Sequence, residues 1–125
     1  MAENRIVIIG SSIAGLSAAE AARAQDPGCL ITLLTEEPYL PYYRQQLCEV
    51  LENRAAAQRL LIHPVAWYAE RDIILRLGQA VTGIDTKART VALKGGGSVP
   101  YDRLVLATGS ASVIPPVRGA ELPGV

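Results

Sequence analysis

Phenylalanine is absent from this sequence, and aromatic residues make up only 5% of it. So few aromatic side chains argue against a surface on which nucleic-acid bases stack. Neither sign of charge is in excess, because 12 Lys and Arg residues balance 12 Asp and Glu residues to a formal net charge of zero. A neutral chain exerts no long-range attraction on nucleic acid or on an anionic membrane, so we expect neither as a partner.

Long hydrophobic runs are missing as well. No apolar run reaches the roughly 18 residues that are needed to cross a bilayer, so we expect no membrane span. Residues 1–10 are too short, and at Glu3 too acidic, for a secretory signal peptide. Together these two absences predict a cytoplasmic protein.

Cysteine and histidine are scarce. Cys29 and Cys48 lie 19 positions apart, without a C-x-x-C spacing, which argues against a redox-active pair and against a metal site. We expect two reduced thiols, with Cys29 buried and inert at the start of a strand. The single histidine, His63, has no second metal-type ligand near it in the sequence, and we expect it to be solvated. We therefore predict no metal site, and no side chain is a candidate acid–base catalyst.

The sequence does contain enough apolar residues for a core. Half of its 125 residues are hydrophobic, which suits one domain with one core. We predict an α/β fold, in which a Rossmann-like parallel sheet carries an antiparallel hairpin or meander insertion. Buried strands are predicted at 5–9, 30–34 and 103–107, and shorter strands at 72–75, 79–84, 90–93 and 98–101. Helices are predicted at 13–25, 45–53 and 64–71, with an irregular loop at 35–43.

The first predicted strand runs directly into a glycine-containing turn made by Gly10, Ser11, Ser12, Ile13, Ala14 and Gly15. A dinucleotide-binding turn needs glycine where the backbone bends and where it approaches phosphate, and a small residue where helix meets strand. Here Gly10 makes the turn, Gly15 permits close helix contact, and Ser12 stands in place of the usual second glycine. Backbone N–H groups at the start of the helix would then face a diphosphate.

An acidic pair follows the second predicted strand. Glu36 lies 21 positions after Gly15, where a carboxylate can accept hydrogen bonds from ribose hydroxyls. Glu37 is a rival for the same role, and we favour Glu36 only slightly. Near the end of the chain, the last predicted strand leads into a second small-residue turn, Ala107-Thr108-Gly109. The two turns together indicate a flavin dinucleotide more than a nicotinamide one.

The stretch 35–47 is more specific than a generic Rossmann unit. The acidic pair is followed by Pro38, by Pro-Tyr-Tyr-Arg at 41–44 and by Leu47. In this order the motifs resemble those of the FAD-dependent pyridine nucleotide oxidoreductases. The branch that looks closest holds NADH:rubredoxin reductases, ferredoxin reductases of oxygenase systems and the flavin part of nitrite reductases. This resemblance implies an incomplete FAD domain of the glutathione reductase type.

The resemblance also implies which residues bind the cofactor. The glycine turn would hold the FAD diphosphate, the acidic pair would meet the adenosine ribose, and Arg44 would reach the adenosine or the diphosphate. The backbone at Val81 would meet the adenine ring, and the second turn would pass beside the dinucleotide. The implied binding residues are Gly10, Ser11, Ser12, Ile13, Ala14, Gly15, Glu36, Glu37, Arg44, Val81, Ala107, Thr108 and Gly109.

The resemblance implies an oxidoreductase in which NAD(P)H gives a hydride to FAD and the reduced flavin passes electrons to an acceptor. Rubredoxin, ferredoxin, a nitrite reductase centre or a small molecule such as a quinone are the candidate acceptors. Because members of this family are much longer, we expect an N-terminal piece of such an enzyme that does not oxidise NADH by itself. Residues 1–113 would form the N-terminal part of the FAD-binding domain, and 114–125 a connector toward an NAD(P)-binding domain.

Two other hypotheses stay open at this point. A short Rossmann domain could bind NAD and transfer hydride to a small substrate, although the required Tyr/Lys or His partner is not visible in the sequence. A non-catalytic nucleotide-binding subunit could instead dock with a partner chain. An unfinished sheet has open edges, which a homodimer or a docked segment would cover.

Overall fold

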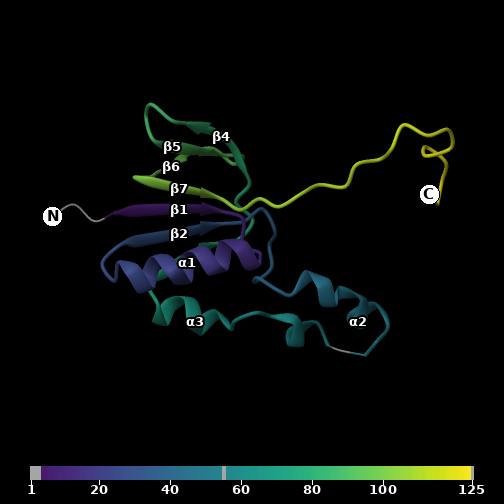
Figure 1. The fold of residues 1–125 in the computed structure, drawn as a ribbon, viewed down its shortest axis with the longest axis horizontal. Coiled ribbons are helices and arrows are strands. Elements are labelled where there is room, and N and C mark those ends of the chain that lie inside the picture. Colours follow the sequence, from purple (N-terminus) through teal and green to yellow (C-terminus); the bar gives the residue numbers. More distant parts are fainter. Residues whose placement is uncertain (1–3, 55, 125) are drawn as a thin grey trace.

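Figure 1 shows the fold in a computed structural model, which describes residues 4–54 and 56–124. The described residues form a four-stranded parallel sheet in the order β3-β2-β1-β7 and a three-stranded antiparallel sheet in the order β4-β5-β6. The strands are β1 (Arg5–Ile9), β2 (Leu30–Leu34), β3 (Ile73–Arg76), β4 (Val81–Asp85), β5 (Thr90–Leu93), β6 (Ser98–Pro100) and β7 (Arg103–Leu106). The helices are α1 (Ile13–Gln25), α2 (Leu47–Leu51) and α3 (Val65–Glu70), with 3-10 turns η1 (Arg44–Gln46) and η2 (Ala57–Leu60). The predicted α/β fold with an antiparallel insertion is confirmed.

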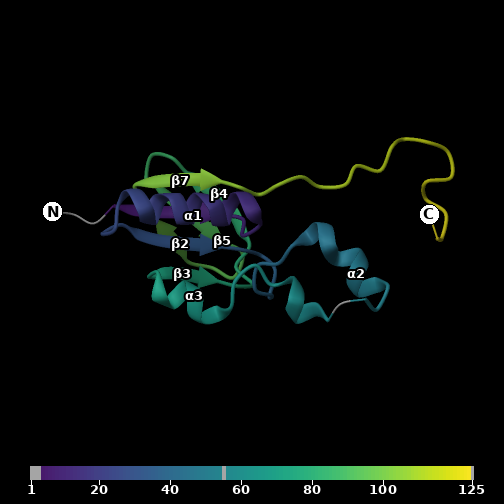
Figure 2. The same cartoon turned by 60° about the horizontal axis from the view of Figure 1, so that its bottom comes forward.

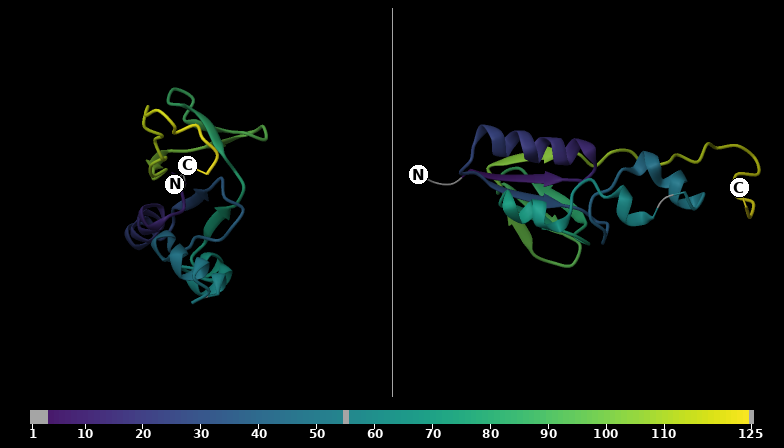
Figure 3. Two further views of the ribbon diagram at one scale, coloured as in Figure 1. Left: turned by 90° about the vertical axis from the view of Figure 1, so that its right-hand side faces the viewer. Right: turned by 90° about the horizontal axis from the view of Figure 1, so that it is seen from below.

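The elements stack in three layers, which the end-on view of Figure 3 separates. Helices α1 and α3 pack on one face of the parallel sheet, and the antiparallel sheet packs on the other. Both faces of the central strands are therefore covered, which explains why β1 and β2 are nearly continuous runs of Ile, Val and Leu.

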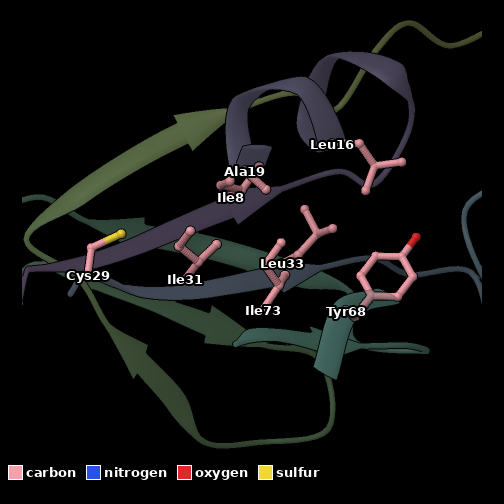
Figure 4. Packing of buried hydrophobic residues seen from close by; sticks show 8 residues of the cluster. All are labelled: Ile8, Leu16, Ala19, Cys29, Ile31, Leu33, Tyr68 and Ile73. Atoms are coloured by element: carbon pink, nitrogen blue, oxygen red, sulfur yellow. The ribbon is translucent and has the colours of Figure 1, made fainter. Parts of the chain in front are cut away.

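The core divides into two clusters because successive side chains of a strand point to opposite faces. Figure 4 shows the helix-side cluster, in which Leu16 and Ala19 of α1 and Tyr68 of α3 lie against the sheet. The sheet contributes Ile8, Ile31, Leu33 and Ile73 to this cluster. The opposite face of the same strands contributes Val7, Ile9 and Leu34, which pack against Val91, Val99 and Tyr101. Full burial of each such aliphatic side chain is worth about 1.5–3 kcal/mol.

Elements of the first third of the chain have the predicted bounds. Strand β1, helix α1 and strand β2 coincide with the predictions at 5–9, 13–25 and 30–34. Asp26 ends α1, and its carboxylate accepts a hydrogen bond from the Gly28 N–H at 3.1 Å. The parallel pairing of β1 with β2, which places Val7 opposite Thr32, makes this segment a βαβ unit.

Two expectations for the middle of the chain need correction, and one element there was not predicted. The strand predicted at 72–75 does not belong to the antiparallel insertion, because β3 pairs parallel with β2. The helix predicted at 45–53 is a 3-10 turn followed by the short α2. The 3-10 turn at Ala57–Leu60 was not predicted. Helix α3 begins after Pro64, as expected.

Strand β7 is not the fully buried strand that its sequence predicts. It forms the outer edge of the described parallel sheet, and only β1 pairs with it there. Arg103 is exposed, and Leu106 is 63% exposed. The pattern of apolar residues along β7 is that of a central strand, but the described residues provide a neighbour on one side only.

The carboxyl ends of the parallel strands all point toward the same end of the molecule, and two segments extend beyond that end (Figure 2). One carries η1, α2 and η2, and the other is the mostly exposed chain from 107 to 124, which contains no helix or strand. None of the helices in the described residues has the length and apolar character that a membrane crossing requires.

Candidate functional site

The turn after β1 brings the ends of three strands together. The N–H of Gly10 donates to the carbonyl of Leu34 at the end of β2, at 2.8 Å, and the Ala107 N–H donates to Ile9 at 2.8 Å. Gly10 has φ +104°, and a Cβ placed on it would lie 2.1 Å from the Ala107 carbonyl oxygen. Only glycine fits here, because any side chain would collide with the backbone that leaves β7.

The second glycine of this turn lets the helix start against the strand. A Cβ on Gly15 would lie 1.9 Å from the carbonyl oxygen of Gly10. Helix α1 therefore begins directly above the end of β1, which is the packing role that the sequence assigns to Gly15.

The N-terminus of α1 is suited to an anion. Ser12 is the N-cap residue, but its side chain makes no capping hydrogen bond, and the first turn carries no acidic residue. The first N–H groups of any α-helix have no acceptor within the helix, and the helix dipole places partial positive charge there. The turn 10–12 that leads into this N-terminus lies at the end of the sheet where the strands meet.

A cavity of about 520 Å³ lies at this end of the sheet. Ten of the thirteen predicted binding residues line it: Gly10, Ser11, Ser12, Glu36, Glu37, Arg44, Val81, Ala107, Thr108 and Gly109. The other three, Ile13, Ala14 and Gly15, do not line it, because they lie within the first turn of α1. Residues more than sixty positions apart in the sequence thus form one concave surface.

Six further residues of the cavity wall were not predicted: Ile9, Leu34, Thr35, Gln79, Ala80 and Ser110. Most of them follow from topology, since the carboxyl ends of neighbouring parallel strands meet at one edge of the sheet. Thr35 is buried, its N–H donates to Arg76, and its carbonyl accepts from the Gln79 N–H at 2.7 Å. The position of Thr35 directly after a buried strand is the signal that could have identified it.

The two acidic residues of the site have different surroundings. Glu36 is exposed at the cavity wall. The Glu37 carboxylate accepts a hydrogen bond from the Arg44 guanidinium and forms an ion pair with it. The same guanidinium lies 5.4 Å from the centre of the Tyr42 ring, in a cation–π arrangement. Burial, and then a hydrogen bond to Glu37, raise the pKa of the Tyr42 hydroxyl.

Residues outside the cavity confirm some expectations and correct one. Cys29 is buried, Cys48 is exposed on α2, and both are free thiols. His63 is not simply solvated: its Nε2 lies 3.0 Å from the Glu20 carboxylate, and its ring stacks on Trp67 at 3.8 Å. In the described part of the chain, no group of His, Cys, Asp and Glu side chains is placed to hold a metal ion.

The groups on the cavity wall are chemically suited to hold a nucleotide. A helix N-terminus and one arginine can balance the charge of a diphosphate, and carboxylates can accept hydrogen bonds from ribose hydroxyls. Close backbone approach is possible where glycine and alanine form the wall.

Comparisons of the sequence and the fold with known proteins identify a family and several relatives. The family model described as pyridine nucleotide-disulphide oxidoreductase matches residues 4–125. The ferredoxin–NAD(+) reductase subunit of the benzene 1,2-dioxygenase system from Pseudomonas putida is 34% identical over 122 residues, 98% of this chain and 30% of the relative. The nitrite reductase [NAD(P)H] of Bacillus subtilis is 34% identical over 127 residues, 100% of this chain and 16% of the relative.

A solved structure gives the same result for the fold. The NADH:rubredoxin oxidoreductase from Clostridium acetobutylicum superposes with a TM-score of 0.79 at 33% identity, covering 91% of this chain and 30% of that protein. The chain thus spans less than a third of the length of each of these three relatives.

Proposed function

The chain belongs to the pyridine nucleotide-disulphide oxidoreductase family, and from this membership we propose that it binds FAD in the cavity at the end of the parallel sheet. We propose further that it is the N-terminal FAD-binding segment of an NAD(P)H-dependent oxidoreductase. Its acceptor would be a ferredoxin, a rubredoxin, a nitrite reductase centre or a small molecule. The relatives described above carry NAD(+), NADH or NAD(P)H and three such acceptors in their names.

One observation carries the proposal: the turn 10–12 that leads into α1, the acidic pair and Arg44 line one cavity. The cradle fits a dinucleotide, because the N–H groups of α1 and the Arg44 guanidinium supply positive charge for two phosphoryl groups. The glycine turn would lie against the diphosphate, with Ser11 and Ser12 close to it and Ile13, Ala14 and Gly15 contributing through the start of the helix. Glu36 or Glu37 would accept hydrogen bonds from the ribose.

The remaining wall residues would hold the rest of the cofactor. The backbone at Val81 would lie against the adenine ring, and Ala107, Thr108 and Gly109 would pass beside the dinucleotide toward the flavin. When bound, FAD supplies the redox chemistry by accepting a hydride and giving up electrons. The cavity-lining residues of this chain would bind and orient it.

The division of the chain is part of the same proposal. Residues 1–113 would be the N-terminal part of the FAD-binding domain, and 114–125 a connector toward an NAD(P)-binding domain. The exposed chain after β7, which runs away from the sheet without helix or strand, supports this division (Figure 1).

The test is reconstitution of the complete protein that carries this chain, after removal of any bound cofactor. We expect FAD to bind and restore a flavin absorption spectrum, and NAD alone to bind much more weakly to this site. Arg44→Ala should weaken FAD binding at least about tenfold, because a charged hydrogen bond is worth about 1.5–3 kcal/mol.

A pair of glycine variants provides the control. Gly10→Ala should abolish FAD binding, whereas Gly95→Ala should not, because a Cβ on Gly95 meets no atom within 4 Å. Since Gly10→Ala also strains the fold, the exposed Arg44 variant is the decisive one. Unchanged FAD affinity in Arg44→Ala, or binding of NAD in preference to FAD, would refute the proposal.

A further inference from the structure

Glu37 is held by three different segments of the chain, whereas its neighbour Glu36 is not. The Glu37 N–H donates to the Thr35 hydroxyl at 3.3 Å, and the Glu37 carbonyl accepts from the Gly78 N–H at 3.0 Å. Its carboxylate pairs with Arg44, at the base of the segment that carries α2. Glu37 therefore connects the end of β2, the loop before β4 and the start of the η1 turn.

Arg44 needs such a partner to keep one orientation. Its side chain is 55% exposed, and a free arginine side chain loses rotamer entropy when it is fixed. The ion pair to Glu37 and the contact with the Tyr42 ring fix it before any ligand arrives. An exposed ion pair contributes little to the free energy of unfolding. The main effect of this pair is therefore to hold the Arg44 side chain in one orientation.

We infer that Glu37 is a positioning residue: its carboxylate holds the Arg44 guanidinium at the cavity wall and leaves Glu36 as the ribose acceptor. This inference rests on the proposed function and makes it more specific. It assigns unequal tasks to two adjacent carboxylates that the sequence alone leaves nearly interchangeable. Glu36 contacts the ligand, and Glu37 acts on the ligand through Arg44.

The experiment compares ADP with 2′-deoxy-ADP as probes of the adenosine half, by calorimetry on the complete protein freed of FAD. Glu36→Ala should weaken ADP about tenfold and remove most of the preference for ADP over 2′-deoxy-ADP, because the lost bond is the one to the ribose hydroxyl. Glu37→Gln should weaken both ligands by the same factor, about three- to tenfold, and keep the preference.

A second set of variants tests the coupling to Arg44. Glu37→Ala should weaken ADP more than Glu37→Gln, because glutamine still offers an acceptor oxygen to the guanidinium. The double variant Glu37→Ala/Arg44→Ala should bind no more weakly than Arg44→Ala, because residues in one interaction act non-additively. Glu52→Gln is the matched control, since it breaks another exposed glutamate–arginine pair, with Arg54, whose residues do not line the cavity.

Three results would overturn the inference. They are loss of the ADP preference in Glu37→Gln but not in Glu36→Ala, tighter ADP binding by Glu37→Ala, and additive effects of the Glu37 and Arg44 variants. A thermal unfolding midpoint lowered much further by Glu37→Gln than by Glu52→Gln would also contradict it, since a positioning role leaves stability nearly unchanged. A different failure, in which the unmodified protein binds neither FAD nor ADP, would refute the proposed function itself.

Discussion

Arg5 and Asp102 join the beginnings of β1 and β7, although they lie 97 positions apart. The Asp102 carboxylate accepts hydrogen bonds from the Arg5 backbone N–H at 2.9 Å, from its Nε at 3.0 Å and from its Nη2 at 2.8 Å. The Asp102 N–H in turn donates to the Arg5 carbonyl at 2.8 Å. This reciprocal contact fixes the register with which β7 enters the sheet, at the end opposite the cavity.

These contacts predict how stability depends on pH. The side-chain and backbone hydrogen bonds from Arg5 hold the pKa of the Asp102 carboxyl well below its usual value. A carboxyl whose pKa is depressed by folding stabilises the protein above its unfolded pKa of about 3.9 and loses that contribution as the pH falls further. We expect Asp102→Asn to unfold more easily than the unmodified protein at pH 7, and the difference to shrink below about pH 4. Chemical denaturation at several pH values measures this; a difference that stays constant down to pH 2 would contradict it.

Gly15→Ala should disrupt the start of α1. The added methyl group would lie 1.9 Å from the Gly10 carbonyl oxygen, which is backbone and cannot rotate away. Overpacking of a well-packed site costs about 1–3 kcal/mol, and we expect a loss of at least this size. Denaturant unfolding of Gly15→Ala beside Gly95→Ala measures it. Equal stability of the two variants would show that the helix can shift to accept the methyl group.

Local sequence patterns predicted the first third of the chain well. Strand β1, helix α1 and strand β2 have their predicted bounds, because each is marked by its own residues: a continuous apolar run, an alanine-rich stretch, and punctuation by glycine or by Asp-Pro-Gly. The glycine turn was likewise placed by its own spacing, and Gly10 and Gly15 take the two close contacts that the spacing implies.

Features that depend on distant partners were not predicted. Strand β3 joins the parallel sheet, and β7 has one neighbour in the described sheet. Both facts depend on which strands pair, and the residues of a single strand do not specify this. The ion pair of Glu37 with Arg44 bridges a loop whose path no local pattern specifies. Thr35, Gln79 and Ser110 join the cavity wall only because the strand ends converge.

Tyr68→Phe should not destabilise the protein. The Tyr68 hydroxyl is buried, and within residues 4–54 and 56–124 no hydrogen-bond partner is found for it. A buried polar group without a partner costs about 1–3 kcal/mol, so its removal should leave the free energy of unfolding unchanged or increase it. Denaturation of the two proteins at pH 7 measures this, and a clear loss of stability in Tyr68→Phe would reveal a partner for the hydroxyl.

The pKa of the Tyr68 hydroxyl leads to a prediction for the protein at high pH. Burial, together with the nearby Glu20 carboxylate, raises the pKa of Tyr68 to about 12. A group whose pKa is raised by folding keeps its full contribution to stability below the unfolded value of about 10 and loses it as the pH rises through the folded value. Because the pKa of Tyr68 is raised by folding, ultraviolet titration should show at least one tyrosine fewer ionising between pH 10 and 11 than after denaturation. Tyr68→Phe should have one late-ionising tyrosine fewer than the unmodified protein.

Arg23 should be the most sensitive charged residue outside the cavity. Its guanidinium donates to four backbone carbonyls, those of Arg71 at 2.9 Å, Pro27 at 2.7 Å, Cys29 at 2.8 Å and Asp72 at 3.0 Å. These bonds tie the last turn of α1 to the segments that lead into β2 and β3. Because the planar fork of donors in the guanidinium matches several acceptors at once, lysine cannot replace Arg23.

We expect Arg23→Lys and Arg23→Met each to lower the free energy of unfolding by about 2–3 kcal/mol, since carbonyls would lose their partners. Arg59→Lys, on the exposed 3-10 turn, is the matched control and should change it little. If Arg23→Lys were as stable as the unmodified protein, a single ammonium group would suffice to hold the two strand entries, and the fork geometry would not be required.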